Sequence, residues 1–95
     1  MNANTSARIL VVDDEDALRE MLGDALRLSG FEVLEATDGS KALALLQKEK
    51  VELIVSDVNM PGMDGFETIA KIKENPQWQE IPVLFVTSHR DEEFL

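Results

Sequence analysis

The sequence predicts an α/β domain built on a doubly wound parallel sheet. Two observations predict it: four short apolar runs, most of them rich in β-branched residues, and three segments between them in which apolar residues recur at helical spacing. Ninety-five residues suit one small domain. Because strands that alternate with helical crossovers form a parallel sheet covered on both faces, we read the order as βαβαβαβ.

Each element has its own local signal. The four apolar runs, at residues 9–12, 31–36, 53–55 and 83–86, are the expected strands. The first helix is expected to end before Gly30, because glycine favours the position after a helix. Asp64 and Glu67 have the spacing of a capping box at the start of the third helix. That helix is expected to end at Asn75 and Pro76.

Composition excludes several classes of protein. The formal net charge of −10 opposes direct binding to nucleic acid or anionic lipid. The chain contains no cysteine, so a disulfide framework and a zinc-thiolate site are excluded, and no apolar stretch has the length of a membrane span. We expect a cytoplasmic protein with a flexible tail at residues 1–7 and one domain at residues 8–95.

Polar residues stand where the expected strands end. Asp13 and Asp14 follow the first strand, Asp57 follows the third and Thr87 follows the fourth. In a flavodoxin-like sheet of strand order 2-1-3-4, the first and third strands are neighbours, and ligands bind at the carboxyl ends of the strands. Three converging carboxylates repel one another unless a hard cation lies among them, which favours Mg²⁺, with Mn²⁺ as a possible substitute. An isolated aspartate such as Asp57 can also act as a nucleophile and form an acyl phosphate.

Three simpler or rival interpretations apply to these aspartates. Asp13 and Asp14 could merely start a helix, since acidic residues favour helix N-termini. A calcium-binding EF-hand loop starting at Asp57 fails, because its twelfth position is Thr68 instead of glutamate. A phosphohydrolase with two paired carboxylates fits poorly, because Asn59 cannot act as the second acid.

Three stretches together resemble the receiver domain of two-component response regulators: "VVDDE", "SDVNMPGMDGFE" and "VLFVTS", in this order along the chain. The resemblance implies that Asp57 accepts a phosphoryl group from a sensor histidine kinase or a phosphotransfer protein. It also implies that Asp13, Asp14 and Asp57 hold Mg²⁺ together with the backbone carbonyl of Asn59, and that Thr87 senses the phosphate. No turnover of small molecules is expected of such a phosphoryl acceptor.

The same resemblance implies a fifth strand that ends in a lysine, followed by a fifth helix, and neither is expected within these residues. None of the lysines falls at an expected strand end. An alternative is therefore an interaction or dimerisation module that keeps this fold but does not work as a phosphorylation switch. Since the fourth strand would be an uncovered edge, we also expect either more chain after Leu95 or a second copy that covers this edge through dimerisation or segment exchange.

Overall fold

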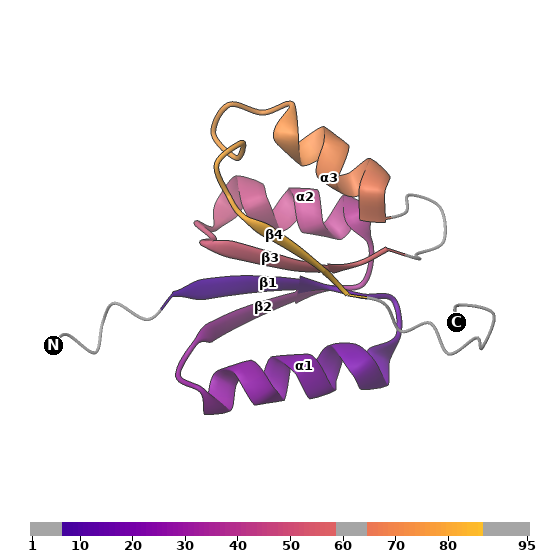
Figure 1. Cartoon of the computed structure of the whole chain (residues 1–95), viewed down its shortest axis with the longest axis vertical. Coiled ribbons are helices and arrows are strands. Elements are labelled where there is room, and N and C mark those ends of the chain that lie inside the picture. Colours follow the sequence, from indigo (N-terminus) through magenta and orange to yellow (C-terminus); the bar gives the residue numbers. More distant parts are fainter. Residues whose placement is uncertain (1–6, 59–64, 87–95) are drawn as a thin grey trace, which may run out of the picture.

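The computed structural model describes residues 7–58 and 65–86, which form a sheet with helices on both faces (Figure 1). Within these residues the elements alternate as the sequence predicts. In chain order they are β1 (Arg8–Val12), α1 (Asp16–Leu28), β2 (Glu32–Ala36), α2 (Gly39–Lys48), β3 (Leu53–Asp57), α3 (Gly65–Lys73) and β4 (Val83–Val86).

All three strand pairings are parallel, and the strand order is β2-β1-β3-β4. Both features confirm the predicted fold class. α1 covers one face of the sheet, and α2 and α3 cover the other (Figure 1). The connections after β1 and β3 therefore leave toward opposite faces, and the crevice between these two strand ends is where such sheets bind ligands.

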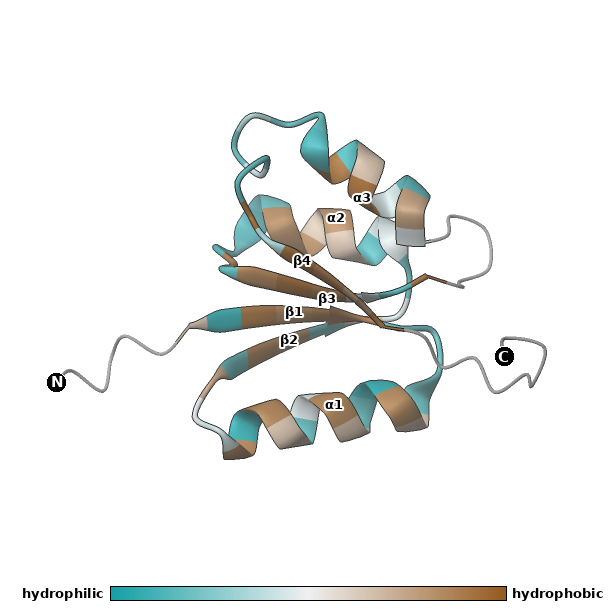
Figure 2. Ribbon diagram, viewed as in Figure 1, coloured by the Kyte–Doolittle hydropathy of each residue, from teal (hydrophilic) through white to brown (hydrophobic). Residues whose placement is uncertain are grey.

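The core is divided by the sheet into two apolar clusters. Leu10, Val12 and Ile54 belong to the larger cluster, on the side of α2 and α3, while Ile9, Val11 and Val55 form the smaller one beneath α1. Successive residues of a strand point to opposite faces, so uninterrupted apolar strands supply both clusters at once. Figure 2 shows the strands as the most hydrophobic part of the ribbon.

α1 ends as the sequence predicts. Gly30 has φ +98°, and its N–H donates to the carbonyl of Arg27 at 3.0 Å. The N–H of Phe31 donates to the carbonyl of Leu26 at 3.1 Å. These two bonds form a Schellman motif, in which glycine takes the left-handed conformation without strain. The first residue of β2 is accordingly Glu32 instead of the predicted Phe31.

Two other boundaries differ by two residues from the prediction. β3 continues through Ser56 to Asp57, because polar residues can occupy a strand whose backbone pairs on both sides. α3 ends at Lys73 and is followed by a turn that contains the predicted stop residues. The predicted capping box of α3 lies partly outside the described residues, since Asp64 is not among them. Among the helices described, none has the length and apolar character required to cross a membrane.

Candidate functional site: an acidic cluster at the carboxyl edge of the sheet

The register of the sheet brings Asp13 and Asp57 to the same level of two neighbouring strands. β1 and β3 are paired as far as Val12 opposite Ser56, so the next residues along the two strands are Asp13 and Asp57. Paired residues point to the same face of a sheet. The register therefore aims both carboxylates into one place at the carboxyl edge.

Asp14 completes an acidic cluster with these two residues. One carboxylate oxygen from each of the three side chains lies within 4.8 Å of the others. Asp13 and Asp57 are fully buried, whereas Asp14 is exposed. The cluster thus has a closed inner side and an outer side that a ligand can approach from water.

Asp13 is held by hydrogen bonds on both its backbone and its side chain. Its N–H donates to the carbonyl of Ala36 at 3.1 Å, and its Oδ1 accepts from the N–H of Glu15 at 2.9 Å. Its Oδ2 is buried and has no hydrogen-bond partner within the described part of the chain. Burial raises the pKa of Asp13 above its ordinary value, the bond from Glu15 opposes this, and the charges of Asp57 and Asp14 add to the rise.

This chemistry fits a hard divalent cation. Buried carboxylates at such close range repel one another, and the buried Oδ2 of Asp13 is an acceptor available to a metal. Mg²⁺ prefers oxygen ligands, keeps several waters and commonly binds through one or two carboxylates, which suits a cluster with one open side. Asp13, Asp14 and Asp57 are the residues that would hold it.

Gly65 packs directly against the backbone that carries Asp57. The N–H of Gly65 donates to the carbonyl of Val58 at 3.1 Å, which brings the start of α3 back to the end of β3. A Cβ atom on Gly65 would overlap the carbonyl oxygen of Asp57 and would lie 2.8 Å from the Cα of Val58. Only glycine permits this approach, so Gly65 fixes where α3 starts relative to Asp57.

Two predicted site residues, Asn59 and Thr87, lie outside the described residues, so their roles stay predictions. Three lysines are placed away from the cluster by their contacts. Lys73 donates to the carbonyls of Gln79 and Ile81, and Lys48 and Lys50 line a pocket of about 460 Å³ at the amino end of the sheet.

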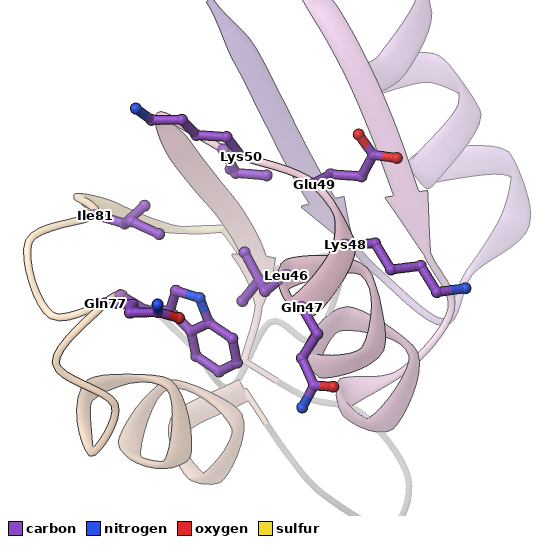
Figure 3. A pocket seen from close by; sticks show the side chains of 9 residues that line it. Leu46, Gln47, Lys48, Glu49, Lys50, Gln77 and Ile81 are labelled. Carbon is purple, nitrogen blue, oxygen red and sulfur yellow. The ribbon is translucent and has the colours of Figure 1, made fainter.

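That pocket has a different character from the acidic cluster. It lies between the end of α2 and the segment before β4, with Leu46 on one side and Ile81 on the other (Figure 3). Trp78 also lines it. It offers an apolar wall with a mixed charged rim, and the three clustered aspartates do not line it. The candidate metal ligands among the described residues therefore lie at the opposite edge of the sheet.

Comparison with known proteins shows the family to which this fold belongs. A family model described as the response regulator receiver domain matches residues 9–95. The chain belongs to this family. Among curated relatives, the response regulator PleD of Caulobacter vibrioides is 45% identical over 83 residues, which are 87% of this chain and 18% of PleD. The response regulator FleR of Pseudomonas aeruginosa is 40% identical over 84 residues, which are 88% of this chain and 17% of FleR.

Solved receiver structures have the same fold. The chemotaxis protein CheY4 of Vibrio cholerae superimposes with a TM-score of 0.85 and 40% identity, covering 95% of this chain and 75% of CheY4. The response regulator TrrA of Thermotoga maritima, solved in complex with Mg(2+)-BeF, gives a TM-score of 0.80 with 32% identity, covering 88% of this chain and 71% of TrrA. The receiver chain spans less than a fifth of PleD and FleR, so it corresponds to one part of these longer proteins.

Receiver domains are signalling modules that take phosphoryl groups from histidine kinases and bind Mg²⁺ through an acidic cluster. In this receiver domain the acidic group consists of Asp13, Asp14 and Asp57. Sequence reasoning found all three but gave no weight to Arg19 or Gly65. A glycine after an aspartate is typical of any turn, and an arginine in a helix is usually a surface residue. A single sequence therefore does not indicate that Arg19 or Gly65 supports a functional site.

Proposed function

We propose that this chain accepts a phosphoryl group on Asp57 from a sensor histidine kinase or a phosphotransfer protein, with Mg²⁺ held by Asp13, Asp14, Asp57 and the carbonyl of Asn59. The observation that carries the proposal is the convergence of three carboxylates within 4.8 Å at the carboxyl edge of the sheet. The solved complex of its relative TrrA with Mg(2+)-BeF supports the choice of metal.

In the proposed transfer, one carboxylate oxygen of Asp57 forms a bond to phosphorus. The bond between phosphorus and the imidazole nitrogen of the donor histidine breaks, and that nitrogen keeps the bonding electron pair. When bound, Mg²⁺ would supply positive charge that offsets the charge of the phosphoryl oxygens. The hydroxyl of Thr87 is proposed to donate a hydrogen bond to a phosphoryl oxygen after transfer.

The surroundings of Asp57 favour this role. Asp57 is the last residue of β3. It pairs with Val86 of β4, and the preceding Ser56 pairs with Val12 of β1, so the carboxylate is presented on a rigid element. Asp14 lies on the exposed side and Asp13 on the buried side, so the two can hold the cation from different directions.

Magnesium should stabilise the protein in a manner that depends on pH. The pKa of Asp13 is higher in the folded protein than in the unfolded chain. Without metal, Asp13 therefore stabilises the fold most below its unfolded pKa of about 3.9, and this stabilisation is lost as pH rises through the folded pKa. Since magnesium binds the ionised carboxylate, the stabilisation by magnesium should grow as pH rises through the folded pKa. At a hundredfold excess over Kd and about pH 7, we expect magnesium to raise the free energy of unfolding by about 2.7 kcal/mol, and Tm by roughly 10–20 °C. Thermal melts with and without magnesium at several pH values measure this, and an equal Tm at about pH 7 would count against the metal site.

Of the two adjacent aspartates, Asp14 is expected to contribute more to metal affinity. It lies nearer the loop and on the open side, where its carboxylate has more freedom to turn toward a cation. Asp14→Asn should therefore raise the Kd for magnesium more than Asp13→Asn does. Calorimetric titration of both variants measures the order, and a larger rise for Asp13→Asn would reverse the assignment.

A further inference from the structure

Arg19 is a buried arginine whose guanidinium joins three segments of the chain. Its side chain is 11% exposed. It donates to the backbone carbonyl of Asp13 at 2.9 Å, to the carboxylate of Asp16 at 2.7 Å and to the carboxylate of Glu35 at 3.3 Å. A buried arginine is rare unless it is paired, and the planar guanidinium can serve three acceptors in fixed directions. One side chain of α1 thus contacts the turn after β1, the start of α1 and β2.

The bond from Arg19 completes the fixation of Asp13. The N–H of Asp13 is held by Ala36, its Oδ1 by the N–H of Glu15, and its carbonyl by Arg19. After these three bonds, Oδ2 is the remaining polar atom of the residue, and it is buried at the acidic cluster. The carbonyl of Asp13 lies just beyond the end of β1. The bond that Arg19 makes to this carbonyl therefore helps to set the direction in which Oδ2 of Asp13 points.

Glu35 of β2 anchors the guanidinium from the other side. Its Oε1 accepts from Arg19 at 3.3 Å, and its Oε2 accepts from Arg27 at 3.0 Å. Gly23 makes room for this anchor, because a Cβ atom there would lie 2.8 Å from Oε2 of Glu35. Glycine in a helix interior is unfavourable by about 1 kcal/mol relative to alanine, so the close approach of Glu35 has a cost in helix stability.

We propose that Arg19 is a positioning residue of the metal site, holding the Asp13–Asp14 turn so that both carboxylates meet Asp57. The inference rests on the proposed function, because it assigns Arg19 a role in binding the cation of that site. It differs from a purely structural role, in which Arg19 would tie α1 to β2 and have no effect on metal affinity. It also differs from a purely electrostatic role, because a positive charge beside the site opposes a bound cation.

The substitution Arg19→Lys distinguishes these roles. Arg19 serves the carbonyl of Asp13 and the two carboxylates with three different nitrogens. Lysine keeps the positive charge and much of the apolar stem but has all its donors on one nitrogen, so we expect it to lose at least one of these bonds. Residues that orient metal ligands typically change metal affinity by about 10–100-fold when replaced. Since Arg19 acts through the backbone of a ligand, we expect the lower end, a rise of about tenfold in the Kd for magnesium, measured by calorimetric titration.

Arg19→Gln tests the sign of the effect. Removing a positive charge would by itself lower the Kd, whereas loss of positioning raises it. A raised Kd in both Arg19 variants supports the proposal. An unchanged or lowered Kd in folded Arg19→Lys would overturn it and leave Arg19 as a tie between α1 and β2.

Arg27→Gln is the matched control. It removes the other arginine that binds Glu35 and leaves the bond to Asp13 in place. We expect a lower Tm and a Kd within twofold of the wild type. An equal rise in Kd for Arg27→Gln and Arg19→Lys would show that general loosening of the α1–β2 contact is responsible, which contradicts the proposal.

Glu35→Gln provides a second test if the Arg19 variants do not fold. It leaves the guanidinium in place but weakens its anchor, so the Kd should rise by less than in Arg19→Lys, and no rise would overturn the proposal. Failure of the proposed function has a different result. In that case the wild-type protein itself would show no binding of magnesium at millimolar concentration.

Discussion

Replacing Asp57 by asparagine is expected to abolish phosphorylation of the protein by a small phosphodonor such as acetyl phosphate in the presence of magnesium. The amide of asparagine is a poor nucleophile, and the change retains the shape of the side chain in its buried position. Wild-type protein should carry a phosphate that hydroxylamine removes, as an acyl phosphate does. Peptide mapping should place it on Asp57.

A conservative control separates this loss from a general effect of removing one carboxylate. Asp24 is an exposed residue of α1, paired with Arg27 at 3.5 Å, and Asp24→Asn should be phosphorylated like the wild type. Phosphate that persists in Asp57→Asn, or that maps to Ser56, Ser88 or His89, would contradict the assignment of Asp57.

Replacing Gly65 by alanine is expected to have the largest effect on stability among single-methyl changes near the site. The added Cβ would meet the backbone of Asp57, which pairs with Val86 of β4, and of Val58, whose N–H donates to the carbonyl of Val86. This backbone cannot move aside as a flexible side chain can. Overpacking against a fixed neighbour typically costs about 1–3 kcal/mol, and we expect the upper end. For a domain of this size, Tm should fall by roughly 10 °C or more.

Gly23→Ala is the control for Gly65→Ala, because the same methyl is added where the nearest atoms belong to the flexible ends of Glu35 and Arg27. The gain in helix propensity of about 1 kcal/mol should offset the displacement of these side chains. Its Tm should stay near that of the wild type. If Gly65→Ala were as stable as Gly23→Ala, the close packing of α3 against the end of β3 would be refuted.

Much of the fold could be predicted because its signals are local. Short uninterrupted apolar runs predict the strands, and apolar residues at helical spacing predict the helices. Gly30 takes the left-handed conformation that its place after a helix requires. To predict that Asp13 and Asp57 converge, it was also necessary to assume that the first and third strands are neighbours in the sheet. Once this strand order holds, the register ends with Val12 opposite Ser56, and the residues that follow these two, Asp13 and Asp57, come to the same level of the sheet.

The supports of the cluster could not be predicted, because they depend on contacts between distant segments. Arg19 reaches the carbonyl of Asp13 and a carboxylate of β2, and no spacing along the chain reveals that pairing. The need for glycine at position 65 arises from the approach of two backbones in space. The burial of Asp13 beside an exposed Asp14 likewise depends on how the turn is held, while strand alternation alone only says that they face differently.

Intact mass is the most direct test of a metal-dependent phosphoryl acceptor at this cluster. The protein is incubated with acetyl phosphate in two samples, one with magnesium and one with a chelator instead, and its mass is measured in each. We predict the addition of one phosphoryl group with magnesium, its removal by hydroxylamine, and no addition with the chelator. An unchanged mass in magnesium, or the same addition in both samples, would contradict the account.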